Sequence, residues 1–415
     1  MGETRFRRLG AALRRQAPEL GLFAFSLAAL AAFSGPRLLH QSHAPHFVYQ
    51  ADAWLHGELH LRVTPPDDND WARVGDRFYV SFPPGPVLLF LPLVAATGFQ
   101  ANDVLLTLLL AAANVPLLFA VLERVSARGE SERSRAENAA LALLFAFGTV
   151  ALAASIRGEV WFTAEVLGVT CTCLYLLCAL GAARPLLAGL FLGLAATTRT
   201  SLLFSAAFFL LEAVRAGGSL RERLLGTGSW RDRALRRKLA LFALGAAPVL
   251  LAAAWMNAAR FGSPLDFGHA HLWNNRVNPD VKRFGLFSLR YLPRNLEAAF
   301  LLLPHLGARG PSYDPRGMSL FVTTPLFLLL FAPRRRAALA PALWVAALSV
   351  ALPALLYMNT GFVQFGYRFS LDFAPYLFLL LAVGGRRMGA AFLALGLAGV
   401  AVNAWGALVF RGGVS

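Results

Sequence analysis

The sequence predicts an all-α, polytopic integral membrane protein with a single membrane-embedded domain over residues 1–415. Three observations predict it: 57% of the residues are hydrophobic, only 15% are charged, and the mean hydropathy is +0.55. Soluble domains carry about 25% charged residues, so this composition excludes a soluble enzyme or a disordered chain. Three cysteines in 415 residues are too few for a secreted disulfide scaffold.

Apolar stretches that approach the roughly 17–25 residues of a membrane span recur along the whole chain. We predict about eleven transmembrane helices, and we expect the shortest to be tilted or to extend into polar flanks. The first follows an arginine-rich segment and is predicted to stay as an anchor instead of being cleaved as a signal peptide. The stretches cover residues 20–36, 102–122, 139–156, 163–180, 186–198, 200–214, 239–256, 319–332, 338–357, 372–385 and 389–410.

The basic residues predict how these helices are oriented. The formal net charge is +16, from 39 Lys and Arg against 23 Asp and Glu. With the N-terminus in the cytoplasm, most basic residues fall in cytoplasmic connections, above all in residues 123–138 and 215–238, as the positive-inside rule expects. Aromatic residues are nearly absent there, so a stacking platform for nucleic acid is not indicated.

This orientation leaves two long outer segments, residues 37–101 and 257–318, which hold much of the polar and aromatic content. Residues 47–55 have the pattern of an amphipathic helix that ends at Gly57. Residues 87–98 are apolar but short for a span, and prolines stand at their start, so we predict a helix along the outer interface. Chemistry or binding is therefore expected at the outer face.

An acid with a neighbouring histidine lies on the amphipathic helix. Tyr49, Asp52 and His56 are three and four residues apart and would share one face. Asp52 is thus a candidate general base just outside a span. The alternative is a solvated interfacial helix whose Asp52 only faces water. The acidic run 67–70 carries oxygen ligands suited to a divalent cation, but a polar turn is the favoured interpretation.

Arginines near the outer ends of spans are candidates for binding phosphate. Arg157, Arg199 and Arg368 occupy such positions, and Arg368 is bracketed by aromatic residues that include Tyr367. Guanidinium groups bind phosphate oxygens through paired hydrogen bonds. Snorkelling of the arginine side chains toward the interface is the alternative interpretation.

Three short motifs occur in a fixed order along this layout. They are Phe82-Pro83-Pro84-Gly85-Pro86 before the interfacial run, Glu123-Arg124 after the second span, and Leu192-Gly193-Leu194-Ala195-Ala196-Thr197-Thr198-Arg199 at the end of a short span. Together with the long first outer segment, they resemble the GT-C superfamily of polytopic glycosyltransferases, which includes protein mannosyltransferases and bacterial lipid A aminoarabinose transferases. The resemblance covers most of the chain.

The resemblance implies a GT-C-like fold and transfer of a hexose or pentose from a polyprenyl-phosphate carrier. The acceptor would be a lipid, glycan or protein at the outer face of a bacterial cytoplasmic membrane. Family members often have a carboxylate base at the start of the first outer loop, where this chain has His43 and His46 and the nearest acid is Asp52. A second acid is expected in the next outer loop, where Glu159 and Glu165 stand.

Under this hypothesis Asp52 is the base, Glu165 or Glu159 supports it, and the arginines hold the leaving phosphate. No cofactor is predicted and no metal ligands are assigned. The alternatives are a transporter or lipid flippase, although polar groups within the spans are few, and a non-catalytic partner in envelope synthesis. The residues predicted to contact substrate are His46, Tyr49, His56, Arg157, Arg199, Tyr367 and Arg368.

Overall fold

The computed structural model describes residues 2–218, 232–273, 279–308 and 310–411, with side chains between residues 17 and 410, and helices dominate it. Two short antiparallel hairpins pair β1 (Trp71–Val74) with β2 (Arg77–Val80), and β3 (His305–Gly307) with β4 (Gly310–Ser312). The α-helices are α1 (Gly2–Ser34), α2 (His46–Leu55), α3 (Val87–Thr97), α4 (Asp103–Ala127), α5 (Arg135–Phe147), α6 (Ala151–Ser155), α7 (Val160–Ala179), α8 (Pro185–Ala196), α9 (Ala206–Arg215), α11 (Arg233–Phe261), α12 (Pro279–Phe284), α13 (Leu292–Leu296), α14 (Leu320–Thr323), α15 (Ala340–Leu356), α16 (Ala374–Val383) and α17 (Ala390–Arg411).

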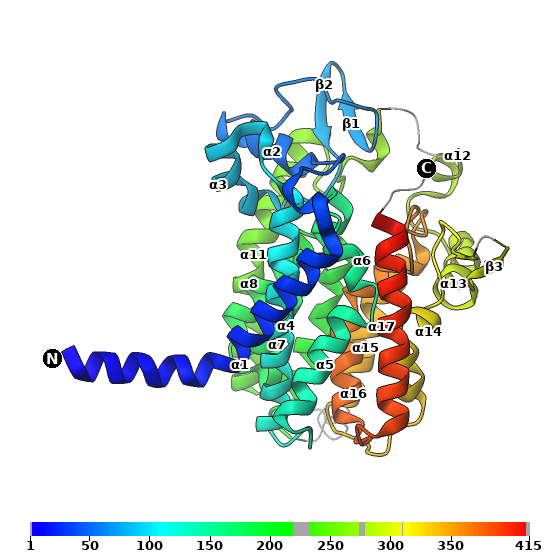
Figure 1. The fold of residues 1–415 in the computed structure, drawn as a ribbon. Helices are drawn as coiled ribbons and strands as arrows, with labels where there is room; N and C mark the ends of the chain where they lie inside the picture. Colours follow the sequence, from blue (N-terminus) through cyan, green and yellow to red (C-terminus); the bar gives the residue numbers. More distant parts are fainter. Residues whose placement is uncertain (1, 219–231, 274–278, 309, 412–415) are drawn as a thin grey trace.

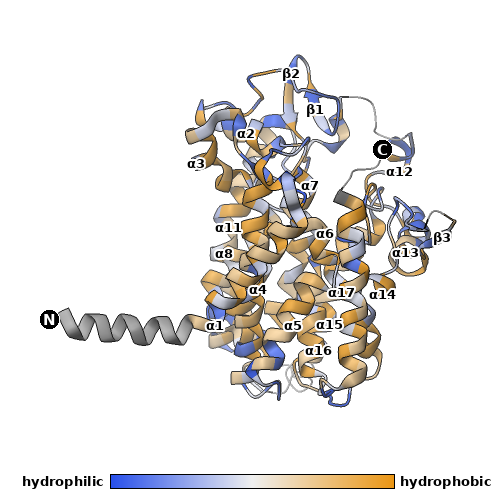
Figure 2. Ribbon diagram, viewed as in Figure 1, coloured by the Kyte–Doolittle hydropathy of each residue, from blue (hydrophilic) through white to orange (hydrophobic). Residues whose placement is uncertain are grey.

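The long helices are those of an integral membrane protein. Among the described residues, five helices are long and apolar enough to cross a membrane, and each coincides with a predicted stretch. Figure 2 shows hydrophobic residues along the bundle and hydrophilic residues gathered at its two ends. The all-α membrane fold class is therefore confirmed. The five segments are Ala17–Leu39, Asp103–Ala127, Val160–Ala182, Arg233–Phe261 and Ala390–Phe410.

The other predicted stretches form shorter or interrupted helices. Stretch 139–156 divides into α5 and α6 at Gly148, where α17 packs closely: a Cβ at Gly148 would lie 3.4 Å from the carbonyl oxygen of Gly396. Stretch 319–332 divides before Pro325, which lacks the N–H that a continuous helix needs. The number of spans and the orientation of the N-terminus stay predictions, and residues 219–231 of the basic connection lie outside the described residues.

Glycines allow α8 and α11 to pack in direct backbone contact. A Cβ at Gly189 on α8 would lie 2.0 Å from the carbonyl oxygen of Phe242 on α11. In the reciprocal contact, a Cβ at Gly245 on α11 would lie 2.0 Å from the carbonyl oxygen of Leu186. Gly189 and Gly193 have the spacing of small residues that bring membrane helices together. These two helices therefore form a closely packed pair.

The two long segments outside the bundle meet at one end of it. Figure 1 shows α2, α3, β1 and β2 gathered there. The amphipathic helix and the interfacial helix predicted from the sequence are present as α2 and α3. Ala72 on β1 forms a β-bridge with Leu272, and the backbone N–H of Trp273 donates to the carbonyl of Trp71 at 2.8 Å. Backbone pairing thus joins the first segment to the second.

Two of the sequence motifs contact each other at this end. The backbone N–H of Gly85 donates a 2.7 Å hydrogen bond to the carbonyl of Thr197. A Cβ at Gly85 would lie only 2.6 Å from the hydroxyl oxygen of Thr197, so only glycine allows the approach. The proline-rich turn before α3 is thereby fixed to the end of α8, two residues before Arg199.

We expect Gly189→Val to destabilise the protein strongly, because its side chain would force α8 and α11 apart. Gly21→Val is the matched control: Gly21 also lies in an apolar helix, but a Cβ there has no atom within 4 Å. Thermal unfolding of the purified proteins in detergent measures the difference. Equal unfolding midpoints for the two variants would contradict the close contact between α8 and α11.

Candidate active site

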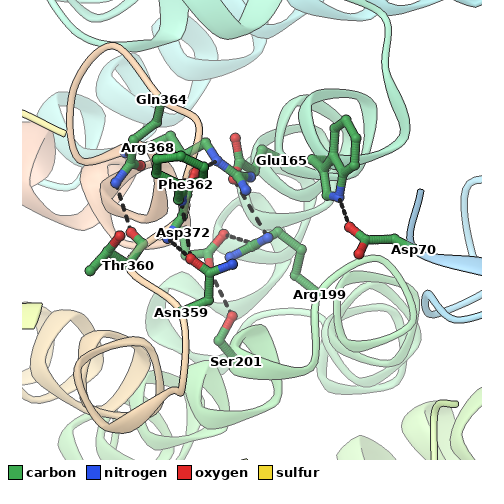
Figure 3. A network of polar contacts seen from close by, with 12 residues as sticks. Asp70, Glu165, Arg199, Ser201, Asn359, Thr360, Phe362, Gln364, Arg368 and Asp372 are labelled. Carbon is green, nitrogen blue, oxygen red and sulfur yellow. Dashed lines mark hydrogen bonds and ion pairs between the residues drawn. The ribbon is translucent and has the colours of Figure 1, made fainter. Parts of the chain in front are cut away.

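A buried ion-pair network joins three segments that are far apart in the sequence. Glu165 on α7 is 0% exposed. Arg368 donates a hydrogen bond through Nη1 to Oε1 of Glu165, and Nη1 of Arg199 lies 3.6 Å from the same oxygen. Figure 3 shows these side chains converging. The structure therefore brings together three of the residues that the sequence singled out.

The end of α8 directs Arg199 into the network. The hydroxyl groups of Thr197 and Thr198 donate hydrogen bonds back to the carbonyls of Leu194 at 2.8 Å and Ala195 at 2.7 Å. The backbone is then extended at Arg199, with φ −146° and ψ 119°. Because the helix stops here, the arginine side chain leaves the axis of α8 and reaches the acids beside it.

Gln364 fixes the loop that carries Arg368. Its Oε1 accepts the backbone N–H of Arg368 at 2.9 Å, and its Nε2 donates to the carbonyls of Thr360 at 2.7 Å and Arg316 at 2.5 Å. Nε of Arg368 donates to the carbonyl of Gly361 at 3.0 Å. A fully buried amide and a main-chain carbonyl thus hold the arginine in one direction.

A second carboxylate, which is not among the residues predicted from the sequence, completes the network. Asp372 ends the short 3-10 helix η10 (Arg368–Asp372) and accepts 2.6 Å hydrogen bonds from Nε of Arg199 and the hydroxyl of Ser201. Two acids and two arginines therefore balance each other in the interior, as buried charges require. The one signal in the sequence is an acid at the start of a predicted span.

The network keeps hydrogen-bonding capacity that the protein does not use. Oε2 of Glu165 is buried without a hydrogen-bond partner. The Nη2 groups of Arg199 and Arg368 donate to no described residue. Both guanidinium groups pack on the ring of Phe369, at 4.9 and 5.0 Å from its centre. Unused guanidinium donors of this kind suit phosphate oxygens.

A second buried ion pair lies beside this network. Glu159 is 0% exposed and is paired with Arg157 at 3.1 Å and with Arg37 at 2.9 Å. The ring of Phe162 packs against both Arg157, at 5.5 Å, and Arg368, at 5.3 Å. Arg157 is therefore a neighbour of the network, but Glu159 already occupies much of its guanidinium group.

His46 and Tyr49 hold α2 against the β1–β2 hairpin. The buried ring of His46 stacks on Trp71 with centres 3.8 Å apart, and its Nε2 donates to the carbonyl of Asn69 at 2.8 Å. Burial lowers the pKa of His46, so its ring is neutral at pH 7. Tyr49 contacts the rings of Trp71 and Phe99. A role for either residue in binding substrate stays a prediction.

Asp52 and His56 share a face of α2, as their spacing predicted, and form a separate cluster. His56 Nδ1 lies 3.6 Å from Asp52 Oδ1, and Arg62 Nη1 donates to both carboxylate oxygens of Asp52 at 3.3 Å. Among the described residues, no contact joins Asp52 to Glu165 or to the arginines of the network. No contact of Asp52 therefore supports its predicted role as a base, and that role stays a prediction.

Asp70 is the acid of the first segment that reaches the edge of the network. Its Oδ2 accepts a 3.1 Å hydrogen bond from Nε1 of Trp161, and Trp161 lies one turn before Glu165 on α7 (Figure 3). Asp70 has φ +60°, which is uncommon for a residue other than glycine. The hydroxyl of Ser81 donates to its carbonyl at 2.7 Å and helps to hold this conformation.

Tyr357 lies at the edge of the network. Its ring packs against Phe369 with centres 6.2 Å apart, and Arg199 and Arg368 both pack on that same Phe369 ring. Tyr357 is therefore one aromatic ring away from both cations. The sequence assigned Asp70 to a polar turn and offered no signal for its hydrogen bond to Trp161, which depends on the packing of the hairpin against α7.

Tyr367 stays buried beside the network. It is 1% exposed, and its hydroxyl has no hydrogen-bond partner. Burial and the nearby Asp372 raise its pKa, so the hydroxyl remains protonated at pH 7. The predicted contact of Tyr367 with substrate stays a prediction.

The acidic run before β1 forms a polar turn. Oδ1 of Asp67 accepts hydrogen bonds from the backbone N–H of Asn69 at 2.9 Å and from Nε1 of Trp71 at 3.0 Å. In the described part of the chain, no group of three or more His, Cys, Asp or Glu side chains is arranged to hold a metal ion. The expectation that the protein needs no cofactor stays a prediction.

No protein-family model and no curated protein matches the sequence. The fold is similar to that of ArnT from Cupriavidus metallidurans bound to undecaprenyl phosphate, with a TM-score of 0.50, 14% identity, and coverage of 95% of this chain and 63% of that one. It is also similar to the oligosaccharyltransferase of Archaeoglobus fulgidus in the apo form (TM-score 0.52, 14% identity, 95% and 56% coverage). A third similar structure is that of AglB from A. fulgidus in complex with an inhibitory peptide and a dolichol-phosphate. Its TM-score is 0.51 and its identity 13%, and the match covers 96% of this chain and 56% of that one.

These neighbours are GT-C superfamily glycosyltransferases. The chain therefore has the GT-C fold, and the resemblance seen in the sequence is confirmed at the level of the fold. The chain spans less than two thirds of the length of each of these proteins. At 13–14% identity the likeness extends to the fold, and the activity has to be argued from the site.

Replacing Glu165 alone should lower the free energy of unfolding more than replacing Glu165 and Arg368 together. We expect Glu165→Leu to destabilise the protein by about 3–5 kcal/mol, because it leaves a buried arginine without its counter-charge. The double variant Glu165→Leu/Arg368→Met should recover much of that loss.

The free energies of unfolding of the single and double variants, measured in detergent, check this prediction. Glu132→Leu is the control, because Glu132 forms an exposed ion pair with Arg335. Additive losses in the double variant would mean that Glu165 and Arg368 do not stabilise each other.

Proposed function

We propose that the protein is a glycosyltransferase that moves a sugar from a polyprenyl-phosphate carrier to an acceptor hydroxyl. The observation that carries this proposal is the pair Arg199 and Arg368, whose unused N–H donors lie beside buried Glu165 on a GT-C fold. Two neighbours with that fold were crystallised with undecaprenyl phosphate or a dolichol-phosphate. A lipid phosphate is the ligand class that suits such a pair of arginines.

The sugar would be a hexose or pentose, and the acceptor a lipid, glycan or protein. The reaction would take place at the membrane face next to α2 and α3, where the segments 37–101 and 257–318 meet. In keeping with the charge distribution, we assign this face to the outside of a bacterial cytoplasmic membrane, with the N-terminus inside.

The arginines would act on the leaving group. As the bond between the anomeric carbon and the phosphate oxygen breaks, negative charge grows on the polyprenyl phosphate. Arg199 and Arg368 are already positioned by Asp372 and Gln364, so they need little reorganisation to stabilise that charge. Arg157 lies one aromatic ring away and would contribute to the same field.

The acceptor hydroxyl must lose its proton as its oxygen bonds to the anomeric carbon. A carboxylate beside the arginines would take that proton. Glu165 and Glu159 are engaged by arginines and suit a positioning role. Between the remaining candidates, Asp70 has the better support: it is tied to Trp161, one turn from Glu165, whereas the contacts of Asp52 are with Arg62 and His56.

The alternative of a transporter or flippase has less support. Such a protein needs polar groups along a path through the bundle. Here the amide of Asn114 donates to the carbonyl of Val166 at 2.9 Å and accepts from Thr170 at 2.7 Å. The amide of Asn403 donates to the carbonyls of Thr323 and Gly399. Both amide NH2 groups are thus satisfied by nearby carbonyls, as expected for structural contacts, and Oδ1 of Asn403 alone is left without a partner among the described residues.

We expect Arg199→Ala and Arg368→Ala to weaken binding of undecaprenyl phosphate by roughly tenfold or more, since each charge-assisted hydrogen bond contributes about 1.5–3 kcal/mol. Native mass spectrometry of the purified protein measures this binding. Arg368→Lys keeps the charge and should lose part of the affinity, because lysine lacks the planar fork.

Arg73→Ala, at a half-exposed arginine on β1, is the control for surface charge. If folded Arg199 and Arg368 variants bind the lipid as tightly as the wild type, these two arginines do not hold the phosphate.

Asp70→Asn should lower sugar transfer by roughly 10²–10⁴-fold if Asp70 is the base. The measurement is complementation of a deletion strain, with mass spectrometry of envelope glycans and of the polyprenyl-linked sugar that accumulates. Asp76→Asn, at an exposed carboxylate in the turn of the same hairpin, is the matched control and should restore transfer. Loss of transfer in Asp52→Asn with full transfer in Asp70→Asn would assign the base to Asp52 instead.

A further inference from the structure

A cavity of about 300 Å³ lies at the end of the bundle away from the candidate site. It is lined by the start of α15, the end of α16, the segment before α15 and the start of α17. The opposite ends of α15 and α16 lead to Tyr357 and Asp372, which belong to the candidate site. The cavity is therefore separate from the ion-pair network.

The walls of the cavity combine two kinds of chemistry. One part is apolar and contains Trp344, Leu380 and Phe392. The other part carries Arg335, Arg336 and Arg386. A cavity with an apolar wall and a cationic rim matches a ligand that has an aliphatic chain and an anionic group.

The rim has more positive charge than the protein neutralises. Arg335 is paired with the exposed Glu132 at 3.2 Å. Arg386 donates through Nε to the carbonyl of Ala332, which leaves its charge unbalanced. Arg336 is exposed and forms no hydrogen bond or ion pair with a described residue. Two of the three cations are thus available to an anion.

The rim is held in place by the backbone. The N–H groups of Arg334 and Arg335 both donate to the carbonyl of Gly384, at 2.8 and 3.0 Å. Arg133 packs on the ring of Phe392 at 5.0 Å and donates to the carbonyl of Leu381 at 3.3 Å. The loops before α15 and α17 are therefore joined, and the cavity between them is a built feature of the fold.

We propose that this cavity binds an anionic glycerophospholipid of the leaflet at this end of the bundle. Arg336 and Arg386 hold the headgroup phosphate, and an acyl chain lies along Trp344 and Phe392. Basic pockets between membrane helices recognise anionic headgroups in this way, because the arginines supply the charge and the apolar wall supplies the chain contact. The proposal does not depend on the proposed glycosyltransferase activity.

The test is native mass spectrometry of the full-length protein, released from detergent with phosphatidylglycerol or phosphatidylcholine added. We expect phosphatidylglycerol to bind at least tenfold more tightly than phosphatidylcholine. Arg336→Gln/Arg386→Gln should remove that preference. Arg334→Gln/Arg387→Gln is the matched control, because these two arginines lie at the same end but do not line the cavity.

Three outcomes would overturn the proposal. One is an equal loss of phosphatidylglycerol binding in the two double variants, which would mean a diffuse surface charge. Another is equal binding of the two lipids by the wild type. The third is full displacement of phosphatidylglycerol by millimolar inorganic phosphate, which would mean a simple anion site. Unchanged unfolding midpoints without lipid verify that the variants are folded.

Discussion

The carboxylate of Glu165 imposes the strongest constraint on this molecule. A fully buried charge inside a membrane bundle is tolerated only with a counter-charge close by. Arg199 and Arg368 supply it, and Arg199 in turn is shared with Asp372. The end of α8 and the short helix before α16 must therefore meet α7 at one point.

This constraint also determines where chemistry can occur. The network lies where the hairpin β1–β2 reaches α7, through the hydrogen bond between Asp70 and Trp161. The proline-rich turn is fixed to the end of α8 through Gly85 and Thr197. A buried, charge-balanced cluster with unused donors thus lies beneath a cap made of both long segments, whereas the opposite end of the bundle carries an excess of arginine around an apolar cavity.

The elements that the sequence predicted well depend on local patterns. Each apolar stretch became a helix or an interrupted helix, because the length of an apolar run is a property of neighbouring residues. The helix α2 and the shared face of Asp52 and His56 follow from spacing in the same way. The interruption at Gly148 was missed, and the close packing of α17 at that point joins residues that are distant in the sequence.

The sequence by itself determined the membrane class, the approximate positions of the helices, and the choice of Glu165, Arg199 and Arg368 as candidate site residues. Only the tertiary structure decided that these three meet, that Asp372 joins them, and that Asp70, and not Asp52, bonds to Trp161 one turn from Glu165. The physical reason is that burial and pairing of charges are set by contacts between segments up to about two hundred residues apart, which no local pattern encodes.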